Sequence, residues 1–427
     1  MAAFRRSGAA SRDDRLQAHS HNKPVTPLRF TTAGESHGPA LVCILEGMPA
    51  GLTLSAADVA NDLARRQQGY GRGRRMQIEK DAAEILSGVR AGTTIGSPIA
   101  MLITNRDWKN WQEIMDPALR DGDPAPRKRL VTRPRPGHAD LSGLLKYDRT
   151  DARDILERAS ARETTARVAA GAICRIFLRA FGVRIGSHVV HLGGIDAQRP
   201  DPFPDDINAV ADQSPLRTLD PAATDRMIER IDAVKREGNT LGGICEVVCD
   251  GIPVGLGSHI SWDRKLDGRL AGAMMSIPAV KAVEIGLGFE TAHRTGAESH
   301  DEIEMAAPPG LPRTGNVHRL TNRAGGLEGG ITTGESLVIR VGMKPISTLM
   351  RPLRTIDVAS GESAHAVAER SDVTAVPAMG VIAEGMAAFI LAQALLEKFG
   401  GDSLGEVRRN YDGYVAAIGS RIARPTA

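Results

Sequence analysis

The stretch AMGVIAEGMAAFILAQALLEK, residues 378–398, predicts a long and nearly all-apolar helix. Gly400 and Gly401 follow it, and glycine commonly ends a helix because it adopts the left-handed backbone without a steric penalty. A second helix is predicted from Ser160 to about Ala180, where a capping-box pattern precedes apolar residues at helical spacing. The chain therefore contains at least two long helices.

Strands are predicted between these helices. Residues 29–46 are expected to form a strand, a polar glycine turn and a second strand, and residues 337–343 alternate in the manner of a strand. Further strands are expected at 83–89, 183–197 and 241–257, and further helices at 55–66, 221–236 and 263–275. No internal repeat and no clean linker follows residue 29, so the pattern predicts one large mixed α/β domain over 29–427, with the order of its strands left open.

The composition is that of a globular protein. Of the 427 residues, 42% are hydrophobic and 25% are charged, which excludes wholesale disorder and fibrous folds. The net charge of +3 is too small for a dedicated nucleic-acid binder. The 54 basic residues are mostly Arg, whose planar fork grips carboxylates and phosphates, so the excess is consistent with a polyanionic substrate. The alternative is a GC-rich genome that replaces Lys by Arg throughout.

Cysteine usage and the N-terminus bear on the compartment. Four cysteines, Cys43, Cys174, Cys245 and Cys249, form no disulfide framework in so long a chain, which predicts a reducing, cytoplasmic setting. No run of about 18 apolar residues was found, so no membrane span is expected. Residues 1–28 lack the apolar run of a signal peptide and are expected to form a flexible, dispensable arm.

Two histidines are candidates for acid–base chemistry. His37 lies in the glycine turn TTAGESHGPA, where exposed backbone lets an imidazole reach a ligand. His138 follows two prolines in RPRPGHADLSG and stands close to Asp140; prolines stiffen a loop, and a stiff loop is a better place for a proton donor. The alternatives are a turn histidine that binds nothing and an ordinary solvated loop histidine.

Two segments are candidates for binding anions. Arg158 and Arg162 flank the helix start at Ser160, where free N–H groups and guanidinium groups converge; the alternative is a capped helix with solvated Arg. Arg370 and Asp372 precede the apolar helix, and an Asp held by Arg stays ionised; the alternative is a simple helix cap.

Glycine turns flank the strand at 337–343. TNRAGGLEGGITTGES and KPIST suit a close approach of backbone to a flat or phosphorylated ligand. Neither a P-loop nor a dinucleotide-binding glycine motif is present, and the His and Cys residues show no metal-ligand spacing, so neither type of nucleotide binding nor a metal site is predicted.

Taken together, these segments resemble the chorismate synthase family from about Arg29 to beyond Glu406. The motifs that carry the resemblance are GESHG at 34–38, RPGHAD at 135–140, SARET at 160–164, AGGLEGG at 324–330, KPIST at 344–348, RSD at 370–372 and AEGM at 383–386. The resemblance implies an α+β fold in which a helical layer lies between two antiparallel four-stranded sheets, assembled as a homotetramer.

The resemblance also implies the reaction. Members of the family eliminate phosphate and a ring hydrogen from 5-enolpyruvylshikimate 3-phosphate in an anti-1,4 sense to give chorismate, the last step of the shikimate pathway. They require reduced FMN although no net redox change occurs. Whether NADPH reduces the flavin on the enzyme or a separate flavin reductase supplies it is left open.

Site roles follow from the matching positions. His37 is similar to the histidine that protonates the departing phosphate, His138 to the one that protonates the reduced flavin, and Asp372 to the aspartate that helps remove the ring hydrogen. The substrate has two carboxylates and a phosphate, and its expected anion clamps are Arg66, Arg72, Arg162, Arg354 and Arg370. The expected FMN contacts are Arg158, Ala159, Ser160, Pro278, Ala279, Gly329, Lys344, Pro345, Ile346, Ser347, Thr348 and Arg370.

Two departures from the family pattern concern the flavin. Ala159 stands where some members have Ser, and Pro278 where many have Asn, so side-chain hydrogen bonds to FMN are lost there while backbone contacts survive. Two other classes remain as alternatives. One is a flavin-independent phosphate lyase that uses the same Arg and His groups, and the other is a nucleic-acid binder that uses the basic loops at 65–75 and 127–135.

Overall fold

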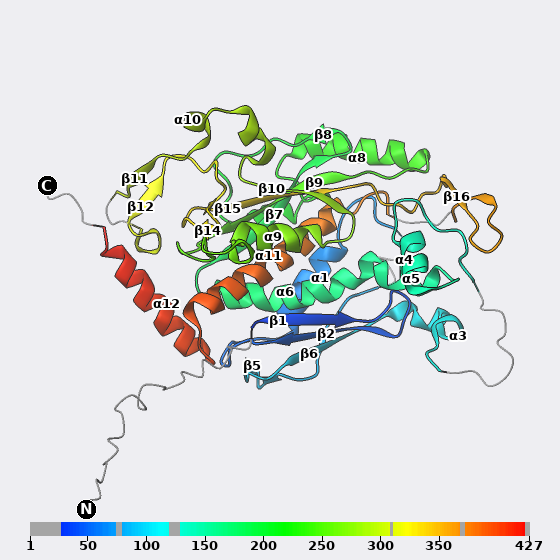
Figure 1. The fold of residues 1–427 in the computed structure, drawn as a ribbon, viewed down its shortest axis with the longest axis horizontal. Helices are drawn as coiled ribbons and strands as arrows, with labels where there is room; N and C mark the ends of the chain where they lie inside the picture. Colours follow the sequence, from blue (N-terminus) through cyan, green and yellow to red (C-terminus); the bar gives the residue numbers. More distant parts are fainter. Residues whose placement is uncertain (1–26, 74–78, 119–128, 308–310, 368–371, 423–427) are drawn as a thin grey trace, which may run out of the picture.

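Two antiparallel sheets enclose a layer of helices in the computed structural model (Figure 1). The structure describes residues 27–73, 79–118, 129–307, 311–367 and 372–422. The helices that fill the layer are α1 (Ala56–Gln67), α6 (Thr164–Arg179), α9 (Leu266–Met275) and α11 (Val376–Phe399). The implied α+β sandwich is therefore confirmed.

The first sheet has the strand order β1-β2-β6-β3. Its strands are β1 (Arg29–Ala33), β2 (Ala40–Glu46), β6 (Ile99–Thr104) and β3 (Glu84–Ile85). The predicted strand, turn and strand over 29–46 is confirmed, and β1 pairs with β2 in the register Thr31↔Ile44. Leu28, one residue before the predicted start of the domain, is buried, and its carbonyl accepts a hydrogen bond from Gln393 Nε2; residues 1–26 of the predicted arm lie outside the described residues.

The second sheet has five strands, in the order β10-β15-β9-β7-β8, where four were expected. They are β10 (Val280–Ile285), β15 (Leu337–Met343), β9 (Gly243–Asp250), β7 (Arg184–Leu192) and β8 (Ile195–Asp196). The extra strand, β8, has two residues and is the return of a hairpin from β7. Gly193 and Gly194 both have positive φ, which a two-residue hairpin loop requires, so β8 pairs back onto the edge of β7.

Shorter elements surround this frame. The remaining helices are η2 (Arg106–Asn110), α3 (Gln112–Met115), α4 (Asp140–Tyr147), α5 (Arg153–Ala159), η3 (Ala161–Glu163), α7 (Ile207–Ala211), α8 (Pro221–Arg236), η4 (Trp262–Arg264), η5 (Gly288–His293), α10 (Gly296–Ser299), η6 (Pro312–Thr314) and α12 (Leu404–Gly419). Four hairpins pair β4 (Val89–Arg90) with β5 (Thr93–Thr94), β11 (Ile303–Met305) with β12 (Val317–Arg319), β13 (Leu327–Glu328) with β14 (Ile331–Thr332), and β16 (Arg354–Ile356) with β17 (Ser363–His365).

The helix α11 is the core of the layer. Among the described helices, it is the one that is long and apolar enough to cross a membrane, although no unbroken apolar run marks it in the sequence. Of its most apolar 18-residue stretch, 94% is buried inside the protein. Because the second sheet, α1, α6 and α9 pack against it, and Phe30 of β1 packs on its Phe389, the helix needs no polar face. Its burial identifies it as a core helix of the fold.

The starts of α1 and α6 are capped differently. At α1, Ser55 and Asp58 form a capping box, in which each side chain accepts from the other residue's backbone N–H. At Ser160 the prediction is wrong: a 3₁₀ turn, η3, comes first, and Ser160 Oγ accepts from the N–H of Arg162. The Glu163 carboxylate does not cap the helix, because it accepts hydrogen bonds from Arg167 Nε at 2.9 Å. The helix α6 therefore begins at Thr164.

A buried carboxylate ties the helical layer to the second sheet. Glu384 of α11 is fully buried and accepts hydrogen bonds from Arg65 at 2.8 and 2.9 Å, from Arg217 at 3.0 Å and from Ser187 Oγ at 2.6 Å. Arg175 lies 3.0 Å from the same carboxylate. Burial would raise the pKa of Glu384, but these arginines lower it to about 2. Arg65 of α1 and Arg175 of α6 therefore act inside the core, as counter-ions of Glu384.

The four cysteines are buried free thiols. Cys245 and Cys249 both face the core from β9, as their strand parity predicts. Burial raises the pKa of Cys43 and of Cys245 to about 12, so neither thiol is reactive at neutral pH.

Candidate active site

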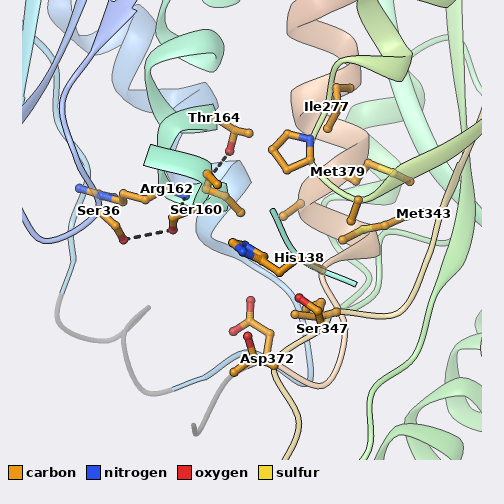
Figure 2. Close-up of a pocket in the computed structure, with 18 of the residues that line it drawn as sticks. Ser36, His138, Ser160, Arg162, Thr164, Ile277, Met343, Ser347, Asp372 and Met379 are labelled. Atoms are coloured by element: carbon orange, nitrogen blue, oxygen red, sulfur yellow. Dashed lines mark hydrogen bonds between the residues drawn. The ribbon is translucent and has the colours of Figure 1, made fainter. Parts of the chain in front are cut away.

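A cavity of about 630 Å³ opens where the ends of α1, α5 and α11 meet the loops that follow β1 and β15. Its polar wall includes Ser36, Ser160 and Arg162, and its apolar wall includes Ile277, Met343 and Met379 (Figure 2). His138 projects between the two walls, and Asp372 lies near Ser347 at one end (Figure 2). The volume is typical of a small-molecule site.

His138 is held by a buried carboxylate. Its Nδ1 lies 2.5 Å from Asp140 Oδ1, and Asp140 is fully buried in the first turn of α4. Arg135 donates three further hydrogen bonds to that carboxylate, two from its guanidinium at 2.9 and 3.2 Å and one from its backbone N–H at 3.0 Å. Burial would raise the pKa of Asp140, but the hydrogen bonds from His138 and Arg135 hold it below its ordinary value. An ionised Asp140 accepts the Nδ1 proton, so His138 would exchange protons with a ligand through Nε2.

His37 has the same kind of partner. Its Nδ1 lies 2.8 and 3.0 Å from the two carboxylate oxygens of Glu157, and its backbone N–H donates to the same carboxylate at 2.9 Å. Glu157 stands in α5, and its side chain is 2% exposed. The cavity therefore has two imidazole–carboxylate pairs on its lining, an arrangement suited to moving protons.

Asp372 binds Arg72 and a backbone amide. The Arg72 Nε–Asp372 Oδ2 distance is 3.0 Å, and the N–H of Gly73 donates to Oδ1 at 2.5 Å. Asp372 does not cap α11, whose N-cap residue is Ala375. The expected partner of Asp372, Arg370, lies outside the described residues, and the arginine that contacts Asp372 in the described part of the chain is Arg72.

Arg66 and Arg162 are buried side by side at the polar wall. Arg66 donates to Thr164 Oγ1 at 2.9 and 3.0 Å and to the Ala161 carbonyl at 2.9 Å. Arg162 donates to Asn105 Oδ1 at 2.9 Å, and Asp81 lies against both arginines. One terminal nitrogen of each is buried without a hydrogen-bond partner among the described residues: Nη1 of Arg66, which lies 3.6 Å from Asp81 Oδ2, and Nη2 of Arg162, which lies 3.5 Å from Glu79 Oε2. Such donors fit an anionic ligand.

The KPIST loop closes the apolar side. Lys344 Nζ donates to the Gly137 carbonyl in the His138 loop, and Lys344 N–H donates to the Ala279 carbonyl at 3.0 Å. Ala279 has a φ of +69°, a left-handed conformation that costs free energy for any residue except glycine. Strain of this kind is found where the surrounding structure must hold a backbone in place.

Most of the predicted site residues meet in this cavity. Those that line it are His37, His138, Asp372, Arg66, Arg72, Arg162, Ala159, Ser160, Pro278, Ala279, Lys344, Ile346, Ser347 and Thr348. They come from seven separate segments of the chain, which sequence proximity could not bring together.

Four predicted residues are not part of the lining in the single chain. Arg158 donates to the carbonyls of Thr32 and Gly34 and so braces the turn that carries His37. Arg354 lies in the exposed hairpin of β16 and β17, and Gly329 lies in the turn between β13 and β14. Pro345 is exposed beside the cavity.

Some residues of the site had no predicted role. Arg135 lies in the RPGHAD motif, and its guanidinium holds Asp140. Glu157 directly precedes Arg158 in the sequence, and its spacing of four residues from Arg153 was the available signal. The apolar wall of Ile277, Met343 and Met379 had no signal, because apolar residues that line a cavity and those that fill a core have the same local pattern.

Comparisons with known proteins point to one family. The family model described as chorismate synthase matches residues 28–396. A chorismate synthase from Symbiobacterium thermophilum is 55% identical over 397 residues, covering 92% of this chain and 100% of that relative. One from Geobacter metallireducens is 57% identical over 389 residues, covering 91% and 98%. A crystal structure of chorismate synthase is 43% identical, covers 93% of this chain and 99% of its own, and has a TM-score of 0.73.

Proposed function

Because this chain belongs to the chorismate synthase family, and so converts 5-enolpyruvylshikimate 3-phosphate to chorismate by loss of phosphate and a ring hydrogen, we propose that the 630 Å³ cavity is its active site. One observation carries this assignment. Two histidines, each on a buried carboxylate, line the same cavity as two buried arginines that each have a terminal nitrogen without a hydrogen-bond acceptor among the described residues. An elimination that releases phosphate needs both proton transfer and anion binding.

The substrate's anionic groups bind to the polar wall. Arg66 Nη1 and Arg162 Nη2 offer buried, charged donors that are already held in place by Thr164 and Asn105. Burial lowers the pKa of Arg66 only to about 10, so it stays protonated at neutral pH. Donors that do not have to reorganise when the anion arrives bind it at a lower entropic cost.

Three side chains of the cavity lining transfer protons. His37 gives a proton from Nε2 to the departing phosphate, because Glu157 occupies its Nδ1. His138, held by Asp140, sits between the walls and protonates the flavin from Nε2. Asp372, kept ionised by Arg72, helps remove the ring hydrogen.

The remaining lining fits reduced FMN. Ile277, Met343 and Met379 offer an apolar wall for a flat ring, and Pro278, Ala279, Ser347 and Thr348 line the cavity with short side chains. When bound there, reduced FMN would supply electron density to the allylic system of the substrate. Ala159 and Pro278 contribute backbone only, so FMN is held chiefly by backbone and by Ser160, Lys344, Ser347 and Thr348.

The family also supports three wider proposals. The enzyme works as a homotetramer in the cytoplasm, in keeping with its four buried free thiols. Its flavin is reduced either by NADPH on the enzyme or by a separate flavin reductase. Turnover measured in air with NADPH and FMN alone separates the two routes, because only an enzyme that reduces its own flavin sustains it.

The flavin requirement is tested by phosphate release under anaerobic conditions. Activity is expected with FMN plus dithionite and is expected to vanish when either is omitted. Full turnover in flavin-free buffer would overturn the FMN assignment and favour a flavin-independent phosphate lyase that uses the same Arg and His groups.

A further inference from the structure

Four side chains, one of them His37, form a closed ring of contacts. The imidazole stacks on the indole of Trp111 with the ring centroids 3.9 Å apart and an interplanar angle of 27°. Arg153 lies 5.0 Å from the Trp111 ring and donates to Glu157 Oε1 at 2.8 Å. Glu157 closes the ring through its two contacts with His37 Nδ1, at 2.8 and 3.0 Å. Every member therefore contacts two others.

Glu157 has the most constrained position in this ring. It lies in α5 one helical turn after Arg153, and its backbone carbonyl accepts the N–H of Ser36 at 2.9 Å. Its carboxylate accepts the N–H of His37 as well as contacting the ring. One residue thus holds both the backbone and the side chain of His37. Burial would raise the pKa of Glu157, but His37 and Arg153 lower it, so the carboxylate stays ionised.

The charges around His37 oppose one another. The negative charge of Glu157 favours the protonated imidazole. The positive charge of Arg153 disfavours it, directly and because Arg153 partly neutralises the same carboxylate. Across Trp111 lie a second cation, Arg129, at 4.7 Å from the indole, and the carboxylate of Asp107, which accepts the Trp111 Nε1–H at 2.9 Å. Of these four charged groups, Glu157 contacts the imidazole directly.

We propose that Glu157 is the positioning residue for His37: it fixes the Nδ1–H tautomer, directs Nε2 to the cavity and stabilises the protonated ring, with Arg153 moderating that effect. The catalytic meaning of this arrangement rests on the proposed role of His37 as the proton donor to phosphate. The arrangement itself is a physical property of the protein that can be measured without turnover.

Trp111 provides the measurement. A protonated imidazole stacked on an indole quenches its fluorescence, so Trp111 emission reports protonation of His37. The chain has three Trp, and Trp108→Phe with Trp262→Phe leaves Trp111 alone. In this background the emission is expected to follow a single titration, which His37→Ala abolishes.

Two substitutions move this titration in opposite directions. Glu157→Gln is expected to shift the midpoint to lower pH by about one pH unit or more, because the carboxylate that favours protonated His37 is gone. Arg153→Met is expected to shift it to higher pH. Glu163→Gln is the matched control, since it also breaks a mostly buried (i, i+4) Arg–Glu pair nearby, with Arg167, and does not contact His37; its midpoint is expected to equal that of the parent. Arg153→Met keeps the test decisive if the Glu157 variant does not fold.

Kinetics then separate this proposal from the proposed function. If His37 is the proton donor, the fall of kcat/KM at high pH moves with the fluorescence midpoint in the Glu157→Gln enzyme. A shifted midpoint with an unshifted kinetic profile would keep the positioning role and remove the catalytic role of His37. A midpoint in Glu157→Gln equal to that of Glu163→Gln would overturn the positioning role, whatever the kinetics show.

Discussion

Gly171 of α6 faces Gly385 of α11 so closely that a Cβ on Gly171 would lie 2.4 Å from Gly385 Cα. The relationship is not symmetric, because a Cβ on Gly385 would lie 3.5 Å from Gly171 Cα, an ordinary contact distance. The two central helices of the layer therefore cross with their backbones in contact. This crossing requires that residue 171 has no Cβ.

Gly171→Ala is expected to destabilise the protein by about 1–3 kcal/mol, because the helices must separate to admit the methyl group. Gly385→Ala is the control, and it is expected to be neutral or to stabilise by up to about 1 kcal/mol through its better helix propensity. Urea unfolding of both variants measures the difference. Equal effects would show that the helices do not cross as described.

Glu384→Gln is expected to cost about 3–5 kcal/mol at neutral pH, because it leaves the surrounding arginines without their buried counter-ion. The control is Glu397→Gln on the same helix, whose exposed pair with Arg269 is worth about 0–1 kcal/mol. Unfolding free energies of both variants at pH 7 test the prediction.

The Glu384 contribution also depends on pH in a defined direction. Its folded-state pKa, about 2, lies below the ordinary value of 4.5, so its stabilisation is complete above about pH 4.5 and is lost as pH falls towards 2. The stability difference between the native enzyme and Glu384→Gln should shrink over this window. A difference that stays constant down to pH 3 would contradict the ion network.

His37→Ala and His138→Ala are each expected to lower kcat by roughly 10²- to 10⁴-fold, the usual contribution of a general acid or base. Melting temperature and oligomeric state should stay those of the native enzyme, because both side chains are at the cavity wall. The assay is anaerobic phosphate release with reduced FMN. Wild-type rates in both variants would refute the assignments.

Arg66→Lys is expected to raise KM by roughly 10- to 100-fold. A lysine side chain cannot donate to Thr164 and Ala161 and, at the same time, to a ligand in the cavity. Arg354→Lys is the comparison, because Arg354 was also predicted to bind an anionic group of the substrate. Arg354 lies outside the cavity lining of the single chain, so its variant should keep the native KM. A large KM effect at Arg354 would place a further part of the substrate site on the β16–β17 hairpin.

Ala279→Gly is expected to stabilise the protein by up to about 1 kcal/mol, because glycine adopts the positive φ at this position without strain. Ala279→Val should instead destabilise it by more than about 1 kcal/mol, since a branched side chain is poorly tolerated there. Thermal melting of the two variants gives the order. Stabilisation by valine would be incompatible with the left-handed backbone.

Local patterns predicted much of the fold correctly. The bounds of α8, Pro221–Arg236, and of β15, Leu337–Met343, agree with the predicted ranges because their periodicity and flanking residues are local. The start of α6 was mispredicted because Glu163 has a better partner in Arg167 than in the cap of Ser160, and patterns of residue type do not rank such competing partners. The short β8 was missed because a two-residue strand carries no periodicity.

The histidines and arginines of the site were recognisable because their motifs are short and contiguous in the sequence. Their roles were separable only in the folded chain. Arg65 and Arg66 are neighbours in one helix, yet Arg65 serves the core at Glu384 and Arg66 faces the cavity at Thr164, because successive residues of a helix point about 100° apart.

The sequence by itself determined which segments form helices and strands, which family the chain resembles and which residue types carry the chemistry, since these depend on local spacing and on motif identity. Only the tertiary structure decided that α6 and α11 cross at Gly171 and Gly385, that β8 extends the second sheet, and that Glu157 and Asp140 are the partners of the two histidines. The Glu157–His37 contact joins residues 120 positions apart. Contacts over such separations arise from packing of whole elements, which no local pattern encodes.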